Sequence, residues 1–159
     1  MKKNKFYPLA GTAVFLVDQW IKDYVENNLK MGEKRKLAEK LELRRVHNPG
    51  ICLGVFANKP ERVKKLTEAG TGIVTVTQML TLLGNNHILK KAGITLAAAG
   101  AWSNLADRYH KDKVVDYIGI KTEKKKLEQV TYNLGDFAIG AGGVFWVLGS
   151  MCKKEGTEL

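Results

Sequence analysis

The chain has 159 residues, enough for one folded unit, and no shift in composition divides it into two. Hydrophobic residues make up 45% of it and charged residues 26%, with a net charge of +10, averages that by themselves suit a basic soluble protein. The two cysteines, Cys52 and Cys152, lie far apart without a metal-ligand pattern around them, which argues against a disulfide framework and a zinc site.

The first segment of helical length runs over residues 7–24, after a short basic stretch that imitates the start of a signal peptide. No small-residue cleavage site closes its apolar part, so we expect an uncleaved membrane helix. Asp18 and Lys22 are four residues apart with the acid first, the favourable order for an ion pair on one helix face. We expect this pair to orient the helix, and direct contact with the chemistry is the alternative.

Residues 28–60 are polar and basic and indicate a small extramembrane platform. The alternation of Leu41, Leu43 and Val46 predicts strands there, and "NPG" predicts a turn after them. His47 is an alternative catalytic base, but a lone histidine in a loop is more often a surface residue. A nucleophile triad cannot be assembled convincingly from the three histidines of the chain.

Three further segments of helical length follow, at residues 66–83, 91–106 and 134–152. Small residues recur at four-residue spacing in the last two of them: Gly93, Ala97, Ala101, Ala138 and Gly142. Such residues let helix backbones approach closely in lipid, where packing drives association. The sequence therefore predicts a mainly α fold, a four-helix transmembrane bundle with a small extramembrane β-platform, in one membrane domain over residues 1–159.

The ionisable residues at membrane depth are the candidate functional groups, because a charge there is costly. Asp136 lies just inside the last segment, on the same helix face as Asn133. Asp116 lies before it in "VVDYIGI", a plausible strand. Two carboxylates held together cannot easily both ionise, so one activates a water while the other donates a proton. This is aspartic-protease chemistry, although the spacing alone does not specify it.

A second polar group, formed by Asn104, Asp107 and Arg108, closes the third segment. It is either a hydrogen-bonded cluster at the end of the bundle or the support of a site.

Five short motifs then occur in one order: "DQWIK", "HNPGICLGVF", "AGAWSNLADR", "VVDYI" and "YNLGDFAI". Together they resemble bacterial signal peptidase II, the lipoprotein signal peptidase, from Asp18 to the end of the last segment. The resemblance implies a four-helix inner-membrane aspartyl protease that removes the signal peptide of diacylglyceryl-modified prolipoproteins. It implies no cofactor, no metal and no nucleic acid, and a monomer surrounded by membrane lipids.

The resemblance also assigns roles to residues. Asp116 and Asp136 are the implied catalytic pair, and Asp18 and Lys22 match a structural pair. Seven others match positions that support the site or contact substrate: Asn48, Gly50, Gly100, Asn104, Asp107, Arg108 and Asn133. Residues 28–59 match the family's β-cradle. Two positions depart from the family pattern, because Gly135 stands where alanine is usual and Pro49 is unusual.

The orientation in the membrane has two conflicting indications. The resemblance implies cytoplasmic termini, whereas counting lysines and arginines in the loops favours the inverted protein. Two other classes of function remain open beside the protease. One is a non-catalytic member of the same fold that binds lipidated signal peptides, and the other is a basic soluble helical protein that binds anionic polymers or surfaces.

Overall fold

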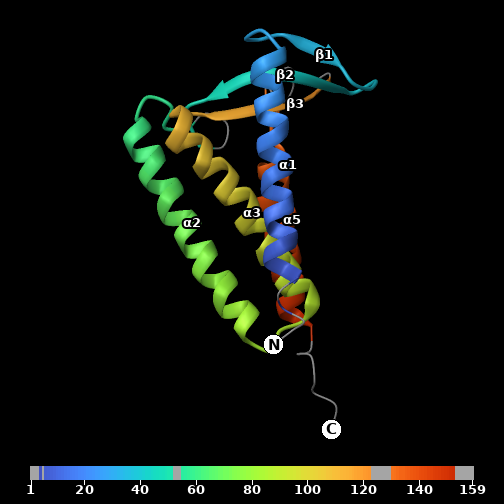
Figure 1. Cartoon of the computed structure of the whole chain (residues 1–159), viewed down its shortest axis with the longest axis vertical. Coiled ribbons are helices and arrows are strands. Elements are labelled where there is room, and N and C mark those ends of the chain that lie inside the picture. The colour runs from blue at the N-terminus through green and yellow to red at the C-terminus, as the bar shows by residue number, and fades with distance from the viewer. Residues whose placement is uncertain (1–3, 5, 52–54, 123–129, 153–159) are drawn as a thin grey trace.

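A computed structural model of the chain describes all residues except 1–3, 5, 52–54, 123–129 and 153–159. Four long helices run along the molecule, and a small antiparallel sheet lies at one end of them (Figure 1). The helices are α1 (Phe6–Asn28), α2 (Pro60–Leu83), α3 (Ile88–Lys111) and α5 (Leu134–Met151). Helix α1 begins and α5 ends at the end of the bundle away from the sheet (Figure 1).

The helix ends follow local sequence signals. Helix α2 begins at Pro60, since proline lacks the N–H that the first helical position leaves unbonded. Helix α3 begins after His87, whose side chain accepts a hydrogen bond from the backbone N–H of Leu89. It ends at Asp112, which has a left-handed backbone with φ of 56°. Helix α5 begins with a capping box between Asn133 and Asp136.

Helix α3 is the centre of the bundle and packs against α1, α2 and α5. The tightest approach is between α3 and α5, where a side chain on Gly93 or Gly142 would collide with the backbone of the other helix. The prediction that small residues permit close helix packing is therefore confirmed at these two positions.

The sheet has the order β1 (Lys34–Lys36), β2 (Leu41–Asn48), β3 (Val114–Ile120) and β4 (Thr131–Tyr132), with every pair antiparallel. A β-bulge interrupts the pairing of β2 with β3 between Leu43 and Val46. A small apolar core joins the end of α1 to the sheet, made of Val25, Leu29, Leu43, Val115 and Tyr117. This core holds β3, and hence Asp116, against the end of the bundle.

Three helices extend further at the sheet end than the predicted spans: α1 covers 6–28 in place of 7–24, α2 60–83 in place of 66–83, and α3 88–111 in place of 91–106. The added turns carry charged residues, which end an apolar run without ending a helix. Among the described residues, α5 is the one helix that is long and apolar enough to cross a membrane by composition. The predicted platform at 28–60 is also incomplete by itself, because β3 and β4 supply half of the sheet.

Candidate active site

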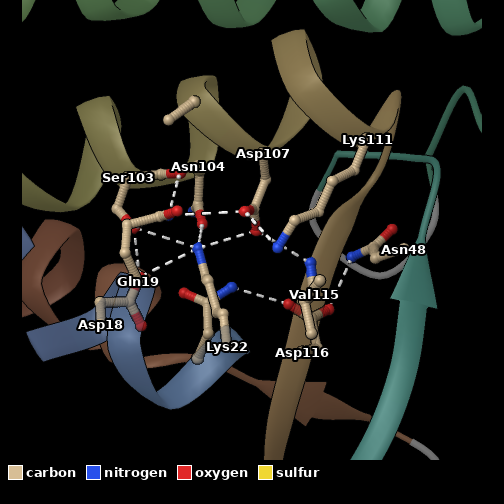
Figure 2. Close-up of polar contacts among 12 residues, drawn as sticks. Asp18, Gln19, Lys22, Asn48, Ser103, Asn104, Asp107, Lys111, Val115 and Asp116 are labelled. Atoms are coloured by element: carbon tan, nitrogen blue, oxygen red, sulfur yellow. Dashed lines mark hydrogen bonds and ion pairs between the residues drawn. The ribbon is translucent and has the colours of Figure 1, made fainter. Parts of the chain in front are cut away.

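The site lies where the sheet meets the bundle. Strand β3 carries Asp116, and the first turn of α5 carries Asp136. The adjoining strand β2 ends at Asn48, and the facing stretch of α3 carries Asn104. Four segments distant in the sequence thus contribute to one group of polar side chains, most of which Figure 2 shows.

Asp116 is buried, with 3% of its surface exposed. Its Oδ2 accepts a hydrogen bond from Asn48 Nδ2 at 3.0 Å, and its Oδ1 accepts one from Asn133 Nδ2 at 2.7 Å. Burial, followed by the charge of Asp136, raises the pKa of Asp116 to about 7, although the two amide donors act in the opposite direction. The carboxyl group of Asp116 is therefore able to hold a proton near neutral pH.

Asp136 is partly buried and is bound from two sides. Its Oδ1 accepts a hydrogen bond from Asn104 Nδ2 at 2.9 Å, and its Oδ2 accepts one from the backbone N–H of Asn133 at 3.1 Å. The Asn133 side chain in turn accepts a bond from the backbone N–H of Asp136 at 2.9 Å. Asn133 thus contacts both carboxyl-bearing residues and sets their relative position.

The turn after β2 is held by Arg108. The backbone N–H of Gly50 donates to Asn48 Oδ1 at 3.0 Å, and the Arg108 guanidinium donates to the Gly50 carbonyl at 2.6 Å. Arg108 is 6% exposed, and its Nε is buried without a hydrogen-bond partner in the described part of the chain. It lines a cavity of about 540 Å³ together with Lys64 and Lys65 of α2. Arg108 therefore connects the turn after β2 to the wall of this cavity.

Asp18 and Lys22 do form the predicted ion pair, at 2.9 Å, but the pair does more than orient α1. Lys22 also reaches Asp107 Oδ2 at 3.1 Å, and Asp18 accepts a hydrogen bond from the Tyr117 hydroxyl at 2.8 Å. The Tyr117 hydroxyl accepts one from the backbone N–H of Leu134 at 3.0 Å. The pair therefore ties α1 to α3, to β3 and to the start of α5.

Gly100 and Gly135 mark the crossing of α3 and α5 beside the site. A side chain on Gly100 would collide with the Gly135 carbonyl. A Cβ added to Gly135 would lie 3.0 Å from Asn133 Oδ1 and 3.1 Å from Asp18 Oδ2. Gly135 therefore lies between Asn133, which binds Asp116 and Asp136, and Asp18, which pairs with Lys22.

The structure brings all of the predicted site residues to this one end of the bundle. Sequence reasoning missed Ser103 and Tyr117, which bind Asp18, and Gln19, which binds Ser103. Their only signal was adjacency to residues already singled out, for example Tyr117 beside Asp116.

The expectation for His47 was wrong in its surroundings, since this residue lies in strand β2 and not in a loop. Its Nε2 lies 2.8 Å from Glu26 Oε1, so His47 contacts the end of α1, which the sequence analysis did not predict. Cys52 lies outside the described residues, and Cys152 is a free, exposed thiol. The described residues contain no group of three or more metal-ligating side chains.

The fold of the chain is similar to that of solved bacterial membrane enzymes. A solved structure of a bacterial membrane enzyme superposes on it with a TM-score of 0.78, covering 98% of this chain and 94% of the other at 20% identity. A second bacterial membrane enzyme gives a TM-score of 0.77 at 20% identity and covers 94% of this chain and 95% of its own. The arrangement of bundle and sheet is thus that of these enzymes.

The sequence then specifies the family. The family model of signal peptidase (SPase) II matches residues 11–152, and the chain belongs to this family. The lipoprotein signal peptidase of Mesorhizobium japonicum is 31% identical over 141 residues, covering 89% of this chain and 82% of the relative. That of Syntrophus aciditrophicus is 25% identical over 151 residues, covering 92% of each chain.

Proposed function

We propose that the protein is a membrane-embedded aspartic endopeptidase that removes signal peptides from diacylglyceryl-modified prolipoproteins, with Asp116 and Asp136 as its catalytic pair. The observation that carries the proposal is the sharing of Asn133. Its side chain donates to Asp116 at 2.7 Å, and its backbone N–H donates to Asp136 at 3.1 Å. Membership of a signal peptidase family supplies the substrate class.

The reaction uses one proton shared by the pair. The ionised carboxylate takes a proton from a water, whose oxygen adds to the carbonyl carbon of the scissile peptide. The protonated carboxyl group donates to the carbonyl oxygen and stabilises the charge that develops there. As the tetrahedral intermediate collapses, the C–N bond breaks and the leaving nitrogen takes a proton from the protonated carboxyl group. The other carboxylate takes a proton from a hydroxyl of the intermediate as the C=O bond forms again, which restores the singly protonated pair. The raised pKa of Asp116 favours the singly protonated pair near neutral pH, because burial and then the charge of Asp136 oppose a second ionisation.

Large apolar side chains that face outward support embedding of the whole bundle in lipid. They occur on α1, α2 and α5, and include Leu16, Trp20, Ile73, Met79, Val147 and Leu148. A soluble protein rarely exposes so much apolar surface, whereas lipid tails would cover it. We infer four spans, with α1 beginning and α5 ending on the cytoplasmic side and the site at the opposite membrane surface.

The cavity beside Arg108 is where we expect the substrate backbone to approach the pair. Arg108 holds the Gly50 carbonyl and lines this cavity, and we expect its guanidinium to donate to a carbonyl oxygen of the substrate. The diacylglyceryl group would remain in the lipid, and the chain would act as a monomer without a cofactor.

The test is cleavage of a synthetic prolipoprotein peptide that carries a diacylglyceryl cysteine, using the purified full chain in nanodiscs. Asp116→Asn and Asp136→Asn should each lower kcat by roughly 10²–10⁴-fold, as expected for loss of a catalytic acid or base. Asp23→Asn, at an exposed aspartate of α1, is the matched control and should cleave normally. A wild-type chain that binds the peptide but never cleaves it would identify a non-catalytic binder. Normal cleavage by either active-site variant would refute the dyad, and partition of the chain into detergent-free buffer would refute the membrane placement.

A further inference from the structure

Lys22 is the centre of a group of buried polar contacts, and Figure 2 shows it among Asp18, Asn104 and Asp107. Its side chain is completely buried. The ammonium donates to Asn104 Oδ1 at 3.0 Å and to Ser103 Oγ at 3.2 Å, and it pairs with Asp18 at 2.9 Å and Asp107 at 3.1 Å. An ammonium has three N–H groups and no acceptor, so every one of these four partners must present an oxygen to it.

The first branch runs through Asn104 to Asp136. An asparagine side chain has one oxygen that accepts and one NH₂ group that donates. Lys22 requires the oxygen and the Asp136 carboxylate requires the NH₂ group, so only one of the two flips of the Asn104 amide satisfies both. The buried cation therefore fixes Asn104 as the hydrogen-bond donor to Asp136.

The second branch runs through Asp107 to the strand that carries Asp116. Asp107 Oδ2 pairs with Lys22 at 3.1 Å and accepts a hydrogen bond from the backbone N–H of Val115 at 3.1 Å. Val115 immediately precedes Asp116 in β3. The position of β3 against α3 is thus fixed one residue before the carboxylate.

We propose that Lys22 is a positioning residue for both halves of the catalytic pair, acting through Asn104 on Asp136 and through Asp107 and Val115 on Asp116. This inference rests on the proposed function and goes beyond the structural role expected of the Asp18–Lys22 pair. Lys22 makes no ion pair or hydrogen bond with Asp116 or Asp136 among the described residues. Its charge does reach Asp116, where it favours the ionised form, so the test must separate this charge effect from positioning. Displacements of about 1 Å can cost on the order of 10²-fold in rate, so a positioning role is measurable in kcat.

The test is a double-mutant cycle in the full chain, in a background that keeps the net charge of the cluster. Asp18→Asn with Lys22→Met removes one negative and one positive charge together, and thermal unfolding in detergent checks that the protein folds. Relative to the wild type, whose cluster has the same net charge, we expect kcat of this double variant to fall about 10- to 100-fold with KM changed by less than about twofold. Asp18→Asn alone measures how much of that fall comes from Asp18. Asn104→Ala should then lower kcat much less in the background without Lys22 than in the background with it.

Lys111→Met is the matched control, because Lys111 also lies near Asp107, at 3.6 Å, but contacts the other carboxylate oxygen. It should leave kcat within about twofold, since it neither orients Asn104 nor binds the oxygen that holds Val115. The proposal is overturned if Asn104→Ala has the same effect on kcat in both backgrounds, or if loss of Lys22 lowers the unfolding temperature and leaves kcat unchanged. Failure of the proposed function is separate, because it would be seen as normal cleavage by Asp116→Asn or Asp136→Asn.

Discussion

Two pairs of carboxylates lie at the same end of the bundle and differ in their partners. Asp18 and Asp107 share the Lys22 ammonium, at 2.9 and 3.1 Å. Asp116 and Asp136 are held by neutral donors, the amides of three asparagines and one backbone N–H, and form no ion pair with a described residue. The first pair is bound directly to a cation, whereas burial and the charge of Asp136 raise the pKa of Asp116 and favour a proton shared by the second pair. The counter-charge, and not the residue type, therefore separates the structural pair from the proposed catalytic pair.

The largest expected contrast comes from neutralising one acid in each pair. Asp107→Asn removes a partner from a fully buried ammonium, so we expect a loss of roughly 2–3 kcal/mol in the free energy of unfolding. Asp136→Asn turns an NH₂ group toward one of two donors, Asn104 Nδ2 or the Asn133 N–H, so we expect a smaller loss of about 1 kcal/mol together with loss of cleavage. Thermal unfolding of both purified variants measures the difference. Equal destabilisation by the two substitutions would show that the pairs are not distinct.

The second expected effect is a pH dependence of stability and of cleavage, which comes from the pair Asp116 and Asp136. The pKa of Asp116 is raised from 3.8 to about 7, so the folded protein binds a proton that the unfolded chain releases. Its contribution to stability is therefore fully present below about pH 4 and is lost as the pH rises through about 7. Cleavage should decline over the same rise, because the shared proton is lost.

The control for this pH effect is Asp116→Asn, which cannot titrate at this position. Between about pH 4 and 7 its unfolding temperature should fall less than that of the wild type. Parallel pH profiles of stability for the two proteins would assign the titration to another group.

The smallest expected effect is at Gly135, which lies between the two pairs. Gly135→Ala adds a Cβ that is 3.0 Å from Asn133 Oδ1 and 3.1 Å from both Asp18 Oδ2 and the Gly100 carbonyl oxygen, so all three neighbours must move by a few tenths of an ångström. A gain in helix propensity of up to about 1 kcal/mol opposes this crowding, and we expect a net change in stability below about 1 kcal/mol. Activity should change by less than about threefold, in line with small displacements at the pair. Gly140→Ala, on the same helix with nothing within 4 Å of the added atom, isolates the propensity gain. A large loss of activity in Gly135→Ala alone would mean that the two pairs are tightly coupled.

Periodicity and composition predicted the helices well and their ends less well. The segment 134–152 was found within one residue, because its apolar run and its capping asparagine coincide with the helix. The third helix extends to Lys111, beyond the predicted end at 106, because Asp107, Arg108 and His110 continue the helix as polar residues with partners in the sheet or on the surface. Polarity ended the predicted span, whereas the helix itself ends where Asp112 takes a left-handed backbone.

The sequence by itself determined the four helices, the strands β2 and β3 and the set of candidate residues, since apolar periodicity, small residues and costly buried charges are local properties. Only the tertiary structure decided how these residues are paired. Asn133 contacts both Asp116 and Asp136, and Lys22 reaches Asn104 and Asp107, through contacts between segments that lie far apart in the chain. Spacing along a sequence cannot specify such contacts, because they depend on how close α3 and α5 approach and on where β3 lies against the end of the bundle.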